Sequence, residues 1–572
     1  MMRMAKLCMA ICALAFAVMV VGAHETGQLF PWPHLFVLIA AMVLFGGLMV
    51  GDISIGTSTV LAVMLAVSLR LFIFEWPASM IGMDPDKYAV GIHRIIQTKS
   101  LATLAQAVPT YYALPAFHLL NSEVALVSGL RGRNVLVAIP ILLGVLLPLT
   151  GAVLAARFTR PSNRSVATGT AALLGAVATI GVLFGYWPIV QTIAVLVWCP
   201  ILIALARFFA TGDRRFVALA IFTTGTALFA HKISMFVVVA AVGMALCIRW
   251  LRIDQWLGRE LSLSSEAIDS ADARTIVALL GVGLALQWVL LTTFARTAII
   301  GKLVPLLTGG FSIVPADKLV RAAVSSNPGI VGILIRRGDF LVLLPAVAGA
   351  SLWLWFRDRS WPMSLLLGAA LAPIAIAGIA IVGVGVVPPQ RAILFGIPMF
   401  AAVLGIAIGR IGGNETTAYR TAAFALVLVL VASQAGSASL APNYPGEPRM
   451  YLSDEEVTGK AFMMEHTGEA VAMDFFYARE QIDFDDPTAS QKPGLSSVSG
   501  VTALNDGLLN ATLMNQSYEN ILLREMAVTR FSSGAYRLTW NPIRVYTNSD
   551  GYNRVLDNGE TIGLVNRSMS RG

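Results

Sequence analysis

Long apolar segments recur along the first three quarters of the chain, and they constrain its fold more than any other feature. At about twenty residues for one helical crossing of a bilayer, residues 1–438 hold about thirteen candidate spans. The composition agrees, with 56% hydrophobic and 13% charged residues, where a soluble globular protein carries about 25% charged residues. The sequence therefore predicts an all-α polytopic membrane domain.

The distribution of positive charge predicts which side each loop occupies. The net charge of +8 comes from Lys and Arg residues spread over many short loops, so it does not indicate a nucleic-acid-binding surface. Short basic loops mark the cytoplasmic side of a membrane protein. Residues 1–23 form either a first span that is not cleaved, which we favour, or a cleavable signal peptide. With a cytoplasmic N-terminus, these loops fall on one side under both interpretations. They carry Arg157, Arg160, Arg164, Arg207, Arg214, Arg215, Arg249, Arg252, Arg259, Arg357, Arg359, Arg410 and Arg420.

The opposite side then receives two long loops, residues 75–134 and 301–339, and the polar tail of residues 439–572. The chain is accordingly predicted to be a multi-pass protein of the plasma membrane, with these three parts outside the cytoplasm. The four cysteines lie in apolar segments and show neither a disulfide framework nor metal-ligand spacing.

The tail has the composition of a soluble domain. Ser453 to Glu456 form a capping box, which predicts a helix to about His466. Residues 469–477 are strand-like, and Tyr518–Met526 is predicted to be helical. Strands are predicted over Arg544–Asn566, with hairpin turns at Asn548–Gly551 and Asp557–Gly559. A small extracytoplasmic α/β domain follows from this pattern.

Polar residues gather in the first long loop, where two carboxylates, Asp84 and Asp86, follow a membrane span. Asp84 is suited to cap a helix and Pro85 to open it, with the helix running to about Thr98. Its periodicity gives an apolar stripe of Ala89, Ile92, Ile95 and Ile96. Asp86, His93 and Gln97 then share a polar face, which we expect to meet the aqueous groove.

Several of these residues have a structural interpretation beside a functional one. Helix capping alone accounts for Asp84, whereas Asp86 gains little from the helix dipole. His93 and Arg94 suit an interfacial helix whose polar groups reach water. His118 and Glu123 lie in an otherwise apolar segment, and ionisable residues at membrane depth indicate a functional site.

Two stretches of this loop, Gly82–Tyr88 and Tyr111–His118, resemble the GT-C glycosyltransferases. These are integral membrane enzymes that transfer sugars from polyprenyl-phosphate donors. They include oligosaccharyltransferase catalytic subunits, protein O-mannosyltransferases and bacterial aminoarabinose transferases. The external acidic loop and the terminal external domain are similar as well. Two features depart from the oligosaccharyltransferases. The tail has no Trp-Trp-Asp motif, and the loop around Ala323–Asn327 lacks a carboxylate, so protein N-glycosylation is not implied.

The resemblance implies an inverting transfer of a sugar from a polyprenyl-phosphate-linked donor to an extracytoplasmic lipid, glycan or protein. Asp84 or Asp86 would serve as general base, directly or through a bound Mg²⁺ or Mn²⁺. Cationic and polar residues would bind the phosphate and the rest of the substrate, although interfacial anchoring also explains each cation. The candidates are His93, Arg94, Tyr111, Tyr112, His118, Glu123, Lys232, Lys318, Arg321 and Arg391.

Two other functions compete with this interpretation. A transporter or flippase of lipid-linked sugars would explain the many spans, but no inverted repeat is evident. A non-enzymatic membrane scaffold would explain the tail, but it leaves the loop from Asp84 to Arg94 without a purpose. An O-antigen-ligase-like enzyme would carry its main external loop late in the chain, whereas the acidic loop here comes early.

Overall fold

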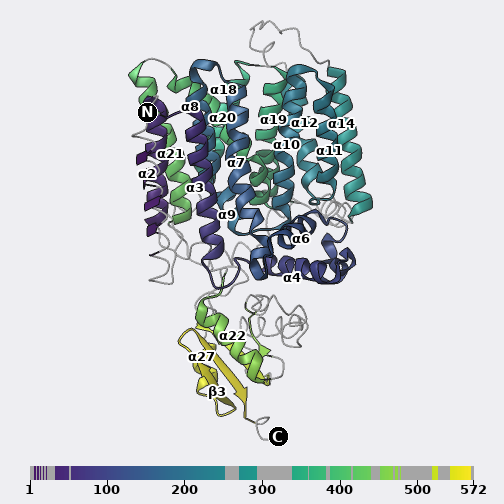
Figure 1. Cartoon of the computed structure of the whole chain (residues 1–572), viewed down its shortest axis with the longest axis vertical. Helices are drawn as coiled ribbons and strands as arrows, with labels where there is room; N and C mark the ends of the chain where they lie inside the picture. The colour runs from purple at the N-terminus through teal and green to yellow at the C-terminus, as the bar shows by residue number, and fades with distance from the viewer. Residues whose placement is uncertain are drawn as a thin grey trace, which may run out of the picture.

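The described part of the chain falls into a large helical bundle and a small mixed part that carries the C-terminus (Figure 1). The computed structural model describes residues 32–50, 53–250, 270–292, 338–358, 360–381, 387–413, 416–439, 451–467, 471–474, 477, 518–525 and 541–567, and isolated positions before residue 22. The fold is mostly helical and apolar, in agreement with the predicted membrane domain. The predicted boundary between the two domains, after residue 438, stays a prediction.

The bundle is built from helices that run between its two ends. In chain order they are α2 (Trp32–Val50), α3 (Ile55–Glu75), α7 (Ala138–Arg157), α8 (Arg164–Val177), α9 (Thr179–Tyr186), α10 (Val190–Thr211), α11 (Arg214–Leu228), α12 (Ser234–Trp250), α14 (Ser270–Ala285), α18 (Gly338–Trp355), α19 (Trp361–Ile381), α20 (Pro389–Gly412) and α21 (Thr417–Ser439). Among the described residues, seven helices are long and apolar enough to cross a membrane, or eight if the bent pair α8–α9 counts as one span. The number thirteen stays a prediction.

Helix α20 forms the centre of the bundle and packs against α7, α8 and α19. Small residues permit the closest of these approaches: a Cβ atom on Gly409 would lie 2.6 Å from the Cβ of Ala167 in α8. Such glycines let two helix backbones come together where apolar side chains alone give no driving force. The first turn of this rigid helix carries Arg391.

The apolar stretch of residues 167–186 is not one straight helix, because α8 and α9 meet at an angle of 48°. Arg70 of α3 is buried beside the break, and its guanidinium donates to the carbonyls of Ala176 at 3.1 Å and Gly181 at 3.2 Å. The backbone N–H of Thr179 donates to the amide oxygen of Gln434 at 3.0 Å. These side chains satisfy backbone groups that a break leaves unpaired inside a membrane.

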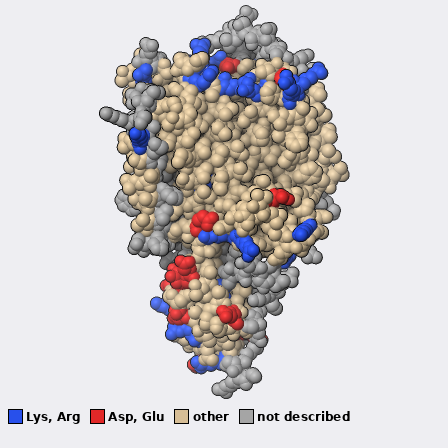
Figure 2. Space-filling view, in the orientation of Figure 1, with Lys and Arg blue, Asp and Glu red and all other residues tan. Residues whose placement is uncertain are grey.

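Positive charge collects at one end of the bundle. Figure 2 shows Lys and Arg along the end farthest from the C-terminal part, above a broad surface with little charge. Several of these arginines lie over tryptophan rings, with Arg357 4.2 Å and Arg410 6.0 Å from the centre of Trp353. The basic loops therefore share one end, as the sequence predicted, and the cytoplasmic assignment of that end stays a prediction.

The C-terminal part contains a four-stranded sheet in the order β1-β2-β4-β3. Its elements are α22 (Asp454–Thr467), β1 (Val471–Ala472), β2 (Asn520–Arg524), α27 (Pro542–Thr547), β3 (Tyr552–Asp557) and β4 (Thr561–Asn566). The capping box at the start of α22 is confirmed: the Ser453 N–H donates to the Glu456 carboxylate at 3.1 Å, and the Glu456 N–H donates to the Ser453 hydroxyl at 3.2 Å.

Two predictions in this part are wrong. The segment Tyr518–Met526, predicted to be helical, contains strand β2, because its five residues are all buried and pair with β4 and β1. The segment predicted as a strand from Arg544 begins in helix α27, so the turn at Asn548–Gly551 joins a helix to β3. The turn at Asp557–Gly559 does join β3 to β4, and Gly559 has the positive φ of 90° that such turns require.

Candidate functional site

The first long loop folds into short helices at the end of the bundle nearest the C-terminal part (Figure 1). They are α4 (Met83–Thr98), η1 (Leu101–Thr103), α5 (Leu104–Ala107), η2 (Pro109–Tyr111) and α6 (Ala116–Ser128), followed by η3 (Gly132–Leu136). Helix α4 ends at Thr98 as predicted, but it begins one residue before Asp84. The N-cap is Gly82, so the predicted capping by Asp84 is wrong.

A close approach by Trp187 explains this start. Gly82 has a φ of +83°, and a Cβ atom there would lie 2.3 Å from the indole nitrogen of Trp187. Only glycine accepts both the left-handed backbone and the crowding. The helix therefore starts directly after Gly82, which places Asp84 and Asp86 in its first turn.

The two carboxylates point to different sides of α4. Positions two residues apart on an α-helix are about 200° apart around its axis. The Asp84 side chain is 37% exposed and lies 3.8 Å from the ammonium of Lys87, whereas Asp86 is 1% exposed. Tyr88 and Gly91 follow Asp84 at helical spacing, so they share its side of the helix.

The predicted polar face of α4 is not exposed to water. Asp86 and His93 are both buried, and only Gln97 of that set is exposed. The His93 ring nitrogen Nε2 lies 3.3 Å from the carbonyl oxygen of Gly132, which connects α4 to η3. Both faces of α4 are therefore packed, because the predicted apolar residues Ala89, Ile92 and Ile95 are buried as well.

Four segments far apart in the sequence bring their rings together beside Asp84. Tyr88 lies 5.7 Å from Tyr111 and 5.7 Å from His118, measured between ring centres. Tyr111 in turn lies 6.3 Å from His118 and 6.2 Å from His231. These rings come from α4, η2, α6 and the turn between α11 and α12. We call this group the ring cluster: Tyr88, Tyr111, His118 and His231.

Charges of both signs act on the ring cluster. Burial raises the pKa of Tyr88 and of Tyr111, and Asp84 raises both further while Arg391 lowers them. Burial and then Arg391 lower the pKa of Lys232. One carboxylate, Asp84, and one cation, Arg391, therefore act on the two phenols, and the second cation, Lys232, is close enough to Arg391 to be affected by its charge.

The two histidines of the ring cluster are neutral at neutral pH. Burial lowers the pKa of His118 to about 4, and neither ring nitrogen has a hydrogen-bond partner within the described ranges. Burial, with Arg391 and Lys232, lowers the pKa of His231, whose Nδ1 accepts from the Ile233 N–H at 3.3 Å. These imidazoles can therefore exchange hydrogen bonds with a ligand but do not supply positive charge.

The structure brings some of the predicted site residues together and places others elsewhere. It brings Asp84, Tyr111, His118, Lys232 and Arg391 together. Asp86 and His93 lie on the other side of α4, and Arg94 is half-buried. Tyr112 is 51% exposed, and Glu123 lies on the exposed side of α6. Lys318 and Arg321 lie outside the described residues, as does most of the loop 301–339.

Sequence reasoning missed Tyr88 and His231 as members of this group. Tyr88 follows Asp84 by four residues, a spacing that places both on one helix side and could have identified it. No local signal connects His231 with Tyr111, because the contact joins segments that are distant in the chain.

The residues do not fit the predicted Mg²⁺ or Mn²⁺ site at Asp84 and Asp86. Their side chains diverge around the helix, so one ion cannot bind both without a change in α4. Where the structure is described, no group of three His, Cys, Asp or Glu side chains could hold a metal ion.

Comparison with known proteins gives similarities of fold. No family model and no curated protein matches the chain. An oligosaccharyltransferase of Archaeoglobus fulgidus, tethered to an acceptor peptide with an NVT sequon, is 15% identical over 83% of this chain and 69% of its own, with a TM-score of 0.48. ArnT from Cupriavidus metallidurans, bound to undecaprenyl phosphate, is 13% identical over 89% of this chain and 98% of its own, with a TM-score of 0.45.

A third solved structure is the arabinofuranosyltransferase AftD from Mycobacteria. It is 15% identical over 89% of this chain and 39% of its own, with a TM-score of 0.40.

Proposed function

We propose that the chain is a membrane glycosyltransferase that moves a sugar from a polyprenyl-phosphate-linked donor to an extracytoplasmic acceptor. The acceptor is a lipid, a glycan or a protein. One observation supports this function above others: the phenols of Tyr88 and Tyr111 lie in the fields of a carboxylate, Asp84, and a guanidinium, Arg391. A base and an anion-binding group at one place are what such a transfer requires.

The reaction needs few groups, because a sugar on a phosphate is already activated. The acceptor oxygen attacks the anomeric carbon from the side opposite the phosphate, which inverts that carbon. The acceptor proton passes to the Asp84 carboxylate. The bond between carbon and phosphate oxygen breaks, and the phosphate leaves with the electron pair. The half-exposed position of Asp84 lets a substrate reach it.

Arg391 and Lys232 would bind the leaving phosphate. Guanidinium groups make paired hydrogen bonds to phosphate oxygens, and an ammonium adds a compact charge. Lys232 and Arg391 each lower the pKa of nearby groups in the ring cluster, which supports their presence at the same site. Asp86 would keep a packing role on the buried side of α4. The site would lie outside the cytoplasm.

Replacing each carboxylate by its amide tests the proposal. We expect Asp84→Asn to lower the transfer rate about 10²–10⁴-fold, the usual loss when general-base help is removed. The assay uses purified protein and radiolabelled polyprenyl-phosphate sugars. Asp86→Asn should retain more activity than Asp84→Asn. Asp213→Asn, at the N-cap of α11 on the basic end, is the matched control, since asparagine caps as well as aspartate.

Two outcomes would contradict the proposal. Full transfer by the double variant of Asp84 and Asp86 would exclude both carboxylates from the chemistry. Movement of lipid-linked sugar across vesicles, without transfer to any acceptor, would favour the transporter interpretation instead.

A further inference from the structure

The turn that carries His231 and Lys232 is held by side chains of another helix. This turn, residues 229–233, connects α11 to α12. Helix α14 continues into η5 (Leu286–Leu291), which has the wider π-helical hydrogen-bonding pattern. Such π-helical turns are rare and often occur at functional sites. Two consecutive residues of η5, Gln287 and Trp288, both reach the turn.

The side-chain amide of Gln287 lies within hydrogen-bonding distance of several backbone oxygens. Its fully buried amide nitrogen lies 2.8 Å from the carbonyl oxygen of Leu228, 3.1 Å from that of His231 and 3.2 Å from that of Ala227. The hydroxyl of Ser234 lies 3.3 Å away. Buried carbonyls without a donor are costly, so this amide fixes the course of the backbone around His231, together with the Ser234 hydroxyl, which also donates to the carbonyls of Ala227 and His231.

Trp288 forms a hydrogen bond with the backbone of Lys232. The indole N–H donates to the Lys232 carbonyl oxygen at 2.6 Å. The ring packs against Phe236 of α12, with 5.3 Å between ring centres. The backbone of Lys232 is therefore held from η5.

Arg391 is held in the same way from a different helix. The side-chain amide of Gln191, in α10, donates to the Arg391 carbonyl oxygen at 2.6 Å, and Gln191 is fully buried. Two like charges such as Lys232 and Arg391 repel each other, so an empty site favours their separation. Fixed backbones oppose that separation.

We infer that Gln287, Trp288 and Gln191 are positioning residues, which hold the backbones of Lys232 and Arg391 so that both cations face one phosphate. This inference rests on the proposed function. Anion binding then gains from a site arranged before the ligand arrives, because less ordering is needed on binding.

The test measures how undecaprenyl phosphate binds to the purified full chain. Trp288→Phe removes the hydrogen bond to Lys232 and keeps the ring. We expect binding about three- to tenfold weaker, the size of one lost hydrogen bond, with a smaller change in kcat at saturating donor. Trp198→Phe is the matched control. It removes a bond of the same kind, from the Trp198 indole to the Phe395 carbonyl at 3.2 Å, and should bind as the unmodified protein does.

A double variant separates positioning from general stability. If Trp288 acts through Lys232, adding Trp288→Phe to Lys232→Gln should cause no further loss of binding. Trp198→Phe combined with Lys232→Gln should bind as Lys232→Gln alone. Gln191→Met provides the same test on Arg391, and it decides the matter if Trp288→Phe fails to fold.

The outcomes distinguish a failure of the positioning role from a failure of the proposed function. If Lys232→Gln and Arg391→Gln both bind undecaprenyl phosphate normally, the phosphate role of these cations is wrong and the proposed function loses its support. If they bind poorly while Trp288→Phe and Gln191→Met bind normally, only the positioning role is wrong. Multiplicative losses in the double variants would also overturn it.

Discussion

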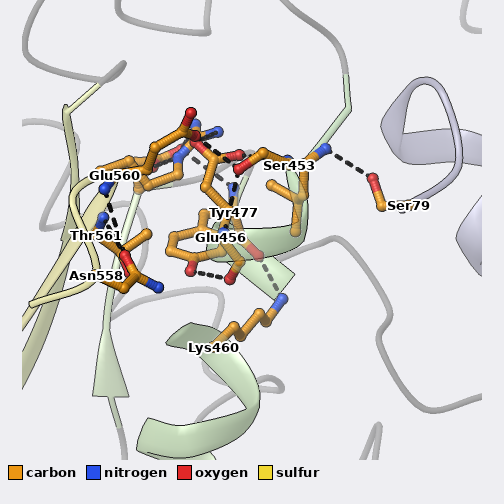
Figure 3. A network of polar contacts seen from close by, with 11 residues as sticks. Ser79, Ser453, Glu456, Lys460, Tyr477, Asn558, Glu560 and Thr561 are labelled. Atoms are coloured by element: carbon orange, nitrogen blue, oxygen red, sulfur yellow. Dashed lines mark hydrogen bonds and ion pairs between the residues drawn. The ribbon is translucent and has the colours of Figure 1, made fainter. Parts of the chain in front are cut away.

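Two groups of charged residues in this protein, one buried and one half-buried, arrange their charges in opposite ways. In the C-terminal part, the guanidinium of Arg524 lies 2.7 Å from Asp474 and 3.5 Å from Glu456, and each side chain is 3% exposed or less. Figure 3 shows the surrounding contacts, in which Lys460 donates to the Tyr477 carbonyl. At the candidate site, by contrast, Lys232 has another cation, Arg391, as its electrostatic neighbour.

The direction of the pKa shifts expresses this difference. Burial lowers the pKa of Arg524, but Asp474 and Glu456 more than compensate, so the pKa of Arg524 is raised. Burial and Arg391 both lower the pKa of Lys232. A buried network whose opposite charges pair with each other is costly to break by removing one partner. Like charges that meet, as Lys232 and Arg391 do, suit the ligand of opposite charge that we propose for this site.

The largest effect on stability should come from the paired network. Arg524→Met leaves Asp474 and Glu456 buried without their cation, and breaking such a pair costs about 3–5 kcal/mol. We expect the C-terminal part to unfold early, as measured by chemical denaturation and limited proteolysis. Arg554→Met is the matched control, because the ion pair of Arg554 with Asp557 is exposed and is worth about 0–1 kcal/mol. Equal losses in both variants would remove the distinction between the two networks.

Removing a cation from the candidate site should weaken ligand binding without lowering the stability of the fold. Arg391→Gln should weaken binding of undecaprenyl phosphate about tenfold to a hundredfold, since hydrogen bonds to charged groups contribute about 1.5–3 kcal/mol. The melting temperature should stay constant or rise, because a repulsion with Lys232 disappears. Arg420→Gln, on an exposed residue at the basic end, is the control. A melting temperature that falls together with binding would show that Arg391 is structural.

Raising the pH should separate binding from stability at Lys232. Its lowered pKa means that it loses its charge below the ordinary range of lysine, so phosphate binding should weaken several-fold as the pH rises through that value. Between the lowered pKa and the ordinary one, the unfolded chain binds more protons at this residue, so stability should rise over the same window. Binding isotherms and melting curves between neutral and alkaline pH measure both. In Lys232→Gln the pH dependence of binding should vanish, and its persistence would assign the titration to another group.

Features encoded by neighbouring residues could be predicted from the sequence. The capping box of Ser453 and Glu456 and the end of α4 at Thr98 depend on contacts within a few residues, and both predictions are confirmed. The apolar stripe of α4 follows from its helical period and is buried. The acidic motif predicted a functional site in the region that contains Asp84.

Features set by distant contacts could not be predicted. The start of α4 depends on Trp187, which lies far along the chain from Gly82. Strand β2 has a helix-like local sequence, and pairing with β4 decides its form. The approach of Lys232 to Arg391, and the bonds from Gln287 to the turn, join helices whose order in space no local pattern gives.

The smallest effect on stability should come from the contact between the C-terminal part and the loop before α4. The backbone N–H of Leu452, just before α22, donates to the Ser79 hydroxyl at 2.8 Å, and Figure 3 shows this bond reaching across to the loop before α4. Tyr451 adds an edge-to-face contact with Trp76, with 5.1 Å between ring centres. The neighbouring Ser453 belongs to the capping box, so the C-terminal part meets the loop before α4 through the two residues Tyr451 and Leu452.

Ser79→Ala should therefore loosen the attachment while leaving each region folded. The lost bond is worth about 0.5–1.5 kcal/mol, which should appear as faster proteolytic release of the C-terminal part, with its own unfolding transition unchanged. Ser549→Ala, in an exposed turn of that part, is the control, because its hydroxyl accepts only from the nearby Gly551 N–H among the described hydrogen bonds. Release at the control rate would mean that the ring contact of Tyr451 suffices. If Ser79→Ala destabilised the protein as much as Arg524→Met, the C-terminal part and the helical bundle would fold as one unit. The contrast between the paired network of Arg524 and the candidate site of Lys232 and Arg391 would then be wrong.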